Sequence, residues 1–182
     1  MVQVGDSGPI GSIIDDSILY AVENGAQIIT LSLTVGETSA INDALDYALD
    51  TADVFIDCAA GNNGSSVGYP ARRPEVMAIA STDHNDNRSS FSNPGPELEV
   101  AAPGSDIRST QTNNSYGVSS GTSFAAPYVA ALAGLIRSMA PGLSAPEVRQ
   151  LIIDTSDDVG NPGFDTLTGH GRINAFQALS ST

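Results

Sequence analysis

An alternation of short apolar runs with amphipathic stretches most restricts how this 182-residue chain can fold. Apolar runs at 28–33 and 54–60 have the length of buried strands, and the segment 39–50 between them repeats apolar residues at helical spacing. Two strands joined through a helix pair in parallel, because the connection is too long for a hairpin. Further strands are predicted at 76–80 and 99–102. The pattern therefore predicts an α/β domain with a mostly parallel sheet.

Helices are predicted before, between and after these strands. The first ends at Asn24-Gly25, and the longest covers about 123–140. The apolar stripe of the longest helix is predicted to consist of Tyr128, Leu132, Leu135, Ile136 and Met139. Ser144 and Glu147 form a capping box that starts another helix, and a short last helix covers 174–179. No repeat or linker interrupts the pattern, so residues 1–182 are expected to form one domain.

Charge and cysteine content exclude several classes of function. The chain has 21 acidic and 7 basic residues, and its net charge of −14 disfavours binding to nucleic acid or anionic lipid. The single Cys58 excludes an internal disulfide and any site with several cysteine ligands. The longest apolar run, Phe124 to Ile136, is too short to span a bilayer, and the first residues do not resemble a signal peptide. We therefore expect neither a nucleic-acid partner nor a membrane partner.

One carboxylate falls inside an apolar strand. Asp57 lies within 54–60, where a sheet covered on both faces would bury it. A buried carboxylate is costly unless it is paired or protonated. Asp57 is thus expected to depart from ordinary surface chemistry.

Two short motifs carry residues suited to catalysis. Ser123 follows Gly121-Thr122 at the start of the longest helix, where exposed backbone N–H groups can activate a nucleophile, although a plain helix cap has the same pattern. Asn62 follows the strand 54–60, and its amide could donate to an oxyanion, although Asn-Gly sequences are also common in turns. Pro127 lies four residues after Ser123.

Together the motifs resemble those of the subtilisin-like serine proteases. The matching segments are 31–33 (LSL), 59–62 (AAGN), 68–70 (GYP), 90–92 (SFS), 102–104 (APG), 121–127 (GTSFAAP) and 169–175 (GHGRINA). The resemblance implies a three-layer α/β fold with a mostly parallel sheet and helices on both faces. It also implies that residues 1–182 are the C-terminal portion of a catalytic domain whose N-terminal strands are missing.

The resemblance assigns roles to individual residues. Ser123 matches the nucleophile, and Asn62 matches the amide that shares the oxyanion hole with the backbone N–H of Ser123. The substrate-binding positions that it implies are Ser32, Leu33 and Thr34 on one wall of the primary specificity pocket, Ala60 and Gly61 on the opposite wall, Gly68 at its floor, and Gly8 on a second edge strand. The Tyr69-Pro70 bond is expected to be cis. Since Gly68 leaves the floor open, large apolar side chains are expected to fit, but Thr34 replaces the usual Gly and could narrow the pocket.

The larger departure from the family is the absence of the segments that carry the histidine base and its aspartate. The family places both before the oxyanion asparagine, in D-[ST]-G and H-G-[TS]-H segments that this sequence does not contain. The two histidines, His84 and His170, fall in polar or Gly-rich loops and are expected on the surface. The isolated chain is therefore expected to be inactive. The full-length protein of which it would form a part is expected to be an extracellular endopeptidase that cuts peptides or proteins. A degenerate, non-catalytic paralogue that binds peptides is the alternative.

Other motifs are weaker. Gly5 to Pro9 resembles the sequence around a chymotrypsin-type nucleophile, but only four residues precede it. The loop from Asp83 lacks the Gly and Glu of an EF-hand. Glu97 and Glu99 fall where some family members hold a weak cation, but a solvated acidic loop fits the same residues better. Structural calcium therefore has no clear motif, and no cofactor is predicted. Strong acidity with arginine but no lysine resembles proteins of salt-loving microbes. The missing N-terminal part of the domain is a further expected partner.

Overall fold

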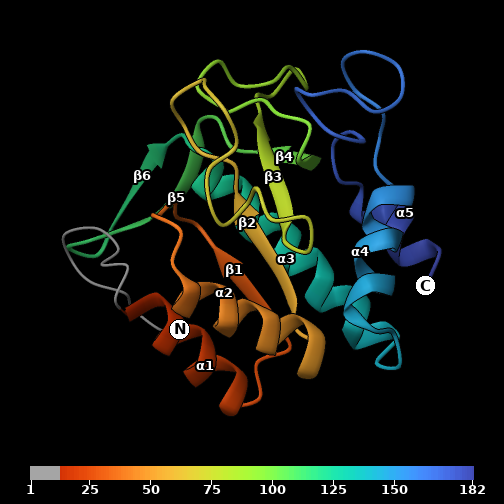
Figure 1. Cartoon of the computed structure of the whole chain (residues 1–182). Coiled ribbons are helices and arrows are strands. Elements are labelled where there is room, and N and C mark those ends of the chain that lie inside the picture. The colour runs from red at the N-terminus through yellow and green to blue at the C-terminus, as the bar shows by residue number, and fades with distance from the viewer. Residues whose placement is uncertain (1–12) are drawn as a thin grey trace.

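Four parallel strands form the central sheet, in the order β1-β2-β3-β4 (Figure 1). The structure is a computed structural model that describes residues 13–182. The strands are β1 (Ile28–Leu31), β2 (Phe55–Ala59), β3 (Met77–Thr82) and β4 (Leu98–Pro103). The predicted parallel sheet is confirmed. Chain order and sheet order coincide, so each crossover moves one strand along the sheet.

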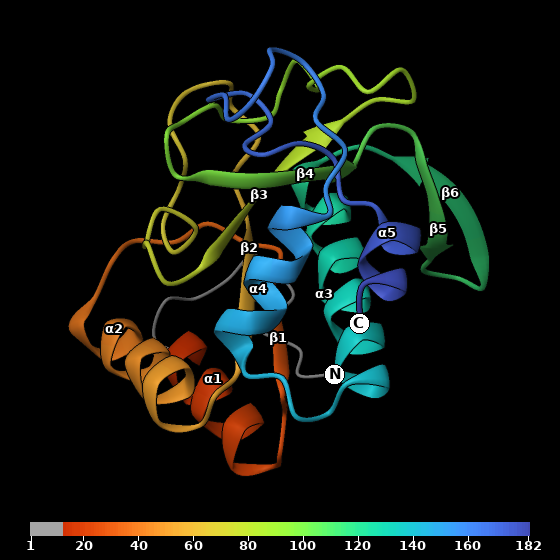
Figure 2. The same ribbon diagram turned by 90° about the vertical axis from the view of Figure 1, so that its right-hand side faces the viewer.

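Helices cover both faces of this sheet, as predicted (Figure 2). One face carries α1 (Ile14–Glu23) and α2 (Ser39–Asp46), which continues as a π-helical turn, η2 (Tyr47–Thr51). The other face carries α3 (Thr122–Met139), with α4 (Ala145–Asp154) and α5 (Ala175–Ser180) packed beside it. Each face has its own apolar core, because alternate strand residues point to opposite sides. The three-layer α/β architecture is therefore confirmed.

The apolar stripe predicted for α3 was only partly right. Leu132 and Ile136 are buried, but Tyr128, Leu135 and Met139 are exposed. The buried face combines alanines with a few larger residues: Thr122, Ala125, Ala126, Val129, Leu132, Ala133 and Ile136. Small side chains let α3 approach β1, β2 and β3 closely, and the larger apolar residues then lie on the outer face.

Two further local features complete the fold. The capping box that starts α4 is confirmed, because the Glu147 carboxylate accepts from the backbone N–H of Ser144 at 2.8 Å. Hydrogen bonds from Ser144 hold the pKa of Glu147 below its ordinary value. An antiparallel hairpin of β5 (Ile107–Gln111) and β6 (Ser115–Ser119) was not predicted. Its residues are mostly polar and exposed, so the sequence lacks the alternation of apolar and polar residues that indicates a half-buried strand.

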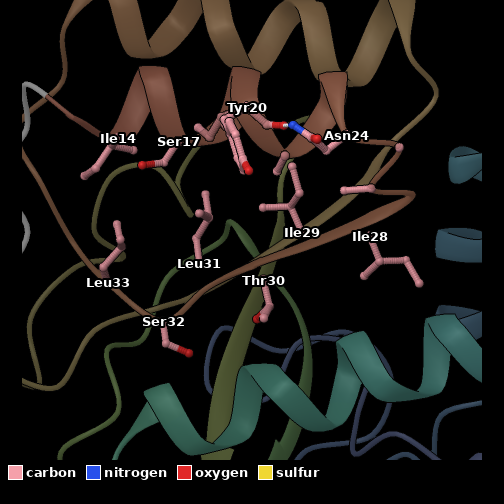
Figure 3. A pocket seen from close by; sticks show the side chains of 14 residues that line it. Ile14, Ser17, Tyr20, Asn24, Ile28, Ile29, Thr30, Leu31, Ser32 and Leu33 are labelled. Carbon is pink, nitrogen blue, oxygen red and sulfur yellow. Dashed lines mark hydrogen bonds between the residues drawn. The ribbon is translucent and has the colours of Figure 1, made fainter. Parts of the chain in front are cut away.

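An open groove runs along β1, the edge strand of the sheet. Within residues 13–182, β1 pairs with β2 only. Figure 3 shows the groove, which is lined by residues of α1, β1 and the chain beside them: Ile29, Leu31 and Leu33 point toward α1, whereas Thr30 and Ser32 point toward α3. Its volume is about 640 Å³, and no charged side chain from the described part of the chain lines it. The groove thus combines apolar surface with a strand edge that pairs with no other strand of residues 13–182.

The helices between residues 13 and 182 include none with the length and hydropathy needed to cross a membrane. The same residues bring together no group of three or more His, Cys, Asp or Glu side chains that could hold a metal ion.

Candidate active site

A hollow of about 700 Å³ lies where the carboxyl ends of β1 and β2 meet the N-terminus of α3. Ligands of parallel α/β sheets bind at this end of the strands. Three segments border the hollow, together with Arg72 and Asn93: residues 32–35 after β1, residues 59–69 after β2, and residues 122–123 at the start of α3. No acidic side chain from the described residues lines it, although the chain is strongly acidic.

Ser123 is the second residue of α3 and is half-buried at the edge of the hollow. The loop before the helix is anchored to β4, because the N–H of Gly121 donates to the carbonyl oxygen of Gly104 at 2.8 Å. A Cβ at Gly104 would lie 2.8 Å from the carbonyl oxygen of Gly121, so only glycine permits this approach. The Ser123 hydroxyl donates to the carbonyl oxygen of Ser32 at 3.2 Å. The predicted nucleophile therefore presents its proton to a backbone acceptor.

Pro127 explains a second link between these two serines. A residue at this position would ordinarily donate its N–H to the carbonyl oxygen of Ser123, four residues earlier. Proline has no N–H, so that carbonyl lacks its helical partner. The Ser32 hydroxyl donates to it instead, at 2.9 Å. The two serines are thus joined by reciprocal hydrogen bonds that fix the N-terminus of α3 against the end of β1.

Replacement of Ser32 by alanine is expected to lower the free energy of unfolding by about 1 kcal/mol, because the Ser123 carbonyl loses its partner. The same replacement in a Pro127→Ala background is expected to cost less, since an alanine in place of the proline restores a helical N–H donor. Denaturant unfolding of the four chains gives the coupling between the two sites. Equal costs in both backgrounds would mean that the Ser32 bond does not substitute for the missing helical bond.

Asn62 is oriented by Thr122, whose role was not predicted from the sequence. The Asn62 Oδ1 accepts from both the backbone N–H of Thr122, at 2.8 Å, and its hydroxyl, at 2.9 Å. The Thr122 hydroxyl also accepts from the N–H of Gly61 at 3.2 Å. With its oxygen held in this way, the amide keeps its Nδ2 donor unpaired within residues 13–182, beside Gly121. A free amide donor next to a helix N-terminus suits stabilisation of an oxyanion.

Asn93 fixes the loop that follows β2 and was also missed. Its side chain is buried, and its Nδ2 donates to the carbonyl oxygens of Ala60, at 3.2 Å, and Ser66, at 2.8 Å. Its Oδ1 accepts from the N–H of Asn63 at 2.9 Å and that of Ser65 at 3.3 Å. One side chain therefore ties together both ends of the segment that carries Asn62. The Ser-Asn-Pro sequence at 92–94 gave no sign of this role.

The other predicted substrate-binding residues have clear positions in the structure. Leu33 and Thr34 line the hollow beside Ser32, and Gly61 and Gly68 line its opposite side. Ala60 is fully buried behind them, and its carbonyl oxygen accepts from the N–H of Gly68 at 2.9 Å. Gly8 lies outside the described residues. The predicted cis bond between Tyr69 and Pro70 is confirmed.

Neither histidine lines the hollow. His84 and His170 are both exposed, and His170 packs against Phe164 with ring centroids 5.2 Å apart.

Asp57 is fully buried in β2, on the face of the sheet that α3 covers. Its Oδ1 accepts from the Thr30 hydroxyl of β1 at 2.6 Å, while its Oδ2 has no partner among residues 13–182. Burial raises the pKa of Asp57 well above its ordinary value, and the Thr30 bond only partly opposes this. Burial also raises the pKa of the neighbouring Cys58 thiol, which favours an unreactive core residue over a nucleophile.

The sequence as a whole matches a known family model. Residues 1–171 match the model of the subtilase family. The chain belongs to the subtilase family. Thermitase from Thermoactinomyces vulgaris is 44% identical over 169 residues, an alignment that covers 91% of this chain and 58% of thermitase. The halolysin-like extracellular serine protease Nep from Natrialba magadii is 41% identical over 181 residues, covering 98% of this chain and 33% of Nep.

The subtilase fold is also found among solved structures. The prenylagaramide maturation protease PagA superposes with a TM-score of 0.85 at 28% sequence identity, covering 98% of this chain and 70% of PagA. The chain therefore spans only part of the length of the subtilases that it matches.

Proposed function

We propose that this chain is the nucleophile-bearing part of a subtilisin-like serine endopeptidase. The observation that carries the proposal is the pairing of Ser123 at the N-terminus of α3 with an Asn62 amide whose Oδ1 is held by Thr122. This arrangement offers a hydroxyl nucleophile and a free N–H donor on one hollow.

The reaction follows from these groups. The Ser123 Oγ attacks the scissile carbonyl carbon while a base takes its proton, and the negative charge on the former carbonyl oxygen is stabilised by Asn62 Nδ2 and the N–H of Ser123. The C–N bond then breaks as the amine leaves with the proton, and an ester forms at Ser123. Water hydrolyses that ester. Neither of the two histidines lies at the hollow, so the base has to come from outside these residues.

We further propose that the groove along β1 receives the part of a peptidase domain that supplies the base. Three features support this: the outer edge of β1 has no partner strand among the described residues, the groove beside it is lined by uncharged side chains of those residues, and reciprocal bonds join Ser32 at the end of β1 to Ser123 (Figure 3). A strand that paired in parallel with β1 would have its carboxyl end at the same edge of the sheet as the carboxyl end of β1, and therefore beside Ser123.

The decisive experiment joins the part of thermitase that precedes the matched region to residue 1 of this chain. The fusion is expected to hydrolyse a peptide p-nitroanilide. Its Ser123→Ala variant is expected to lose that activity, and its Asn62→Ala variant to lose about 100- to 1000-fold in kcat, the range measured for the equivalent change in subtilisin. A folded fusion with no Ser123-dependent activity would instead favour a non-catalytic, peptide-binding protein. Extracellular peptides or proteins are the proposed substrates, in keeping with the similarity to the extracellular serine protease Nep.

Salt dependence is proposed from the excess of acidic residues. With 21 acids and 7 bases, repulsion destabilises the folded chain, and salt screens it. We expect the melting temperature to rise as sodium chloride increases from about 0.1 M, where the Debye length is about 10 Å, to about 1 M, where it is about 3 Å. Differential scanning calorimetry measures this shift. Equal melting temperatures across the range would contradict adaptation to high salt.

A further inference from the structure

Thr34 occupies the space that the predicted specificity pocket would otherwise leave open. A Cβ at Gly68 would lie 2.6 Å from the Thr34 Cγ2, and a Cβ at Gly61 would lie 3.6 Å from the same methyl carbon. The methyl group therefore lies close to both glycines that line the hollow with it. The open floor expected from Gly68 is not free in this structure, because Thr34 covers it.

The backbone on both sides of Thr34 is held in place. The N–H of Val35 donates to the carbonyl oxygen of Tyr69 at 2.9 Å, and the Cys58 thiol donates to the carbonyl oxygen of Leu33 at 3.5 Å. Threonine is also branched at Cβ, which restricts its side-chain rotation. The backbone that carries Thr34 is thus tied to two neighbouring segments, and the branched side chain has few rotamers through which its methyl group can move.

The segment that carries Gly61 is also fixed in position. Gly61 lies directly against the buried Asn93 side chain, because a Cβ on Gly61 would overlap the Nδ2 of Asn93. The four hydrogen bonds of Asn93 clamp residues 60–66. Packing on both sides therefore fixes the width between Thr34 and Gly61.

From this geometry we infer that Thr34 limits the side chain bound between Gly61 and Gly68 to a small one, such as that of alanine or serine. The inference rests on the proposed function, since it specifies which peptides the hollow binds. It replaces the preference for large apolar side chains that an open Gly68 floor suggested. A bulky side chain would have to overlap the Thr34 methyl or displace two clamped segments, and overpacking of this kind is costly.

The experiment measures binding to the chain itself, without turnover. Two peptides with a free terminal carboxylate, acetyl-Ala-Ala-Pro-Ala and acetyl-Ala-Ala-Pro-Phe, are titrated into the isotope-labelled protein, and the amide signals of Gly61, Gly68 and Ser123 are followed by NMR. The alanine peptide is expected to bind at least about 10-fold more tightly than the phenylalanine peptide, a ratio typical of steric selection in a pocket.

Three variants test whether the methyl group is responsible. Thr34→Gly and Thr34→Ser both remove the methyl, and each is expected to bind the phenylalanine peptide at least as tightly as the alanine peptide. Thr34→Val keeps a methyl and is the matched control, so it should retain the preference for alanine. The spectra of the free variants establish that each is folded.

The outcomes separate this inference from the function on which it rests. If the unaltered chain binds the phenylalanine peptide as tightly as the alanine peptide, with shifts at the same amides, the role of Thr34 is overturned and the peptide-binding hollow stands. The role of Thr34 is also overturned if Thr34→Ser keeps the original preference. If neither peptide shifts these amides in any folded form, the proposed function itself is overturned.

Discussion

Peptide hydrolysis by the isolated chain is expected to be at least about 10⁵-fold slower than hydrolysis by the fusion with the thermitase segment. In subtilisin, a member of the same family, removal of triad residues lowers kcat by about 10⁶-fold, and the oxyanion hole and substrate binding account for the remaining rate. Here the Ser123 hydroxyl donates to the Ser32 carbonyl, which cannot take its proton. Without a base, the hydroxyl remains a weak nucleophile.

The two proteins are compared with the same p-nitroanilide at equal concentration, and the Ser123→Ala form of each serves as the blank. Circular dichroism establishes that the isolated chain is folded during the assay. Activity of the isolated chain that approaches that of the fusion, and that disappears with Ser123→Ala, would require a base within the chain and would refute the proposed division of the catalytic groups.

Replacement of Asp57 by asparagine is expected to change how stability depends on pH. Because burial raises the pKa of Asp57, this carboxyl stays protonated in the folded chain under conditions in which it ionises in the unfolded chain. The unfolded chain then binds fewer protons than the folded one. Asp57 therefore contributes stability below about pH 4, and this contribution falls by about 1.4 kcal/mol per pH unit as the pH rises toward the folded pKa.

The asparagine side chain does not ionise, so the difference in free energy of unfolding between variant and parent should shift in favour of Asp57→Asn with each pH unit above about 4. The amide also has a donor that meets no acceptor at the Oδ2 position, but that cost is the same at every pH. Urea unfolding between pH 4 and 8 measures the difference. The control is Asp16→Asn, which removes a carboxylate from an exposed position on α1 and so separates the effect of burial from that of the loss of an acidic residue. Parallel curves for Asp57→Asn and the parent would show that Asp57 is ionised in the folded chain.

The strands of the central sheet and the helices could be predicted because each has a strong local pattern, which the exposed hairpin of β5 and β6 lacks. The continuous apolar runs of β2 and β3 indicate strands buried on both faces, and the Ser144 capping box marks the start of α4. The inner face of α3 could not be read in the same way. Its largest apolar residues suggested the buried side, but close packing against the sheet requires alanines there, and hydrophobicity alone does not reveal that distance.

Site residues could be predicted where they belong to a recognisable sequence motif, but not where their role depends on contacts with segments far away in the sequence. Ser123 and Asn62 lie in such motifs, and the structure brings both to one hollow. The contacts of Thr122 and Asn93 join segments 60 and about 30 residues apart, so no local pattern announces them. The effect of Thr34 depends on where its methyl lies relative to Gly68, which the spacing of residues along the chain does not determine.

Cys58 gives this protein a built-in reporter of local opening. It is the only cysteine in the sequence, it is fully buried in β2, and its thiol contacts the carbonyl oxygen of Leu33. A thiol reagent can reach it only when β2 separates from its neighbours, so the rate of modification measures how often that part of the sheet opens. Because the loop with Asn62 begins just after β2, and Leu33 adjoins Thr34, a slow rate would mean that both walls of the hollow are held rigidly before any peptide arrives.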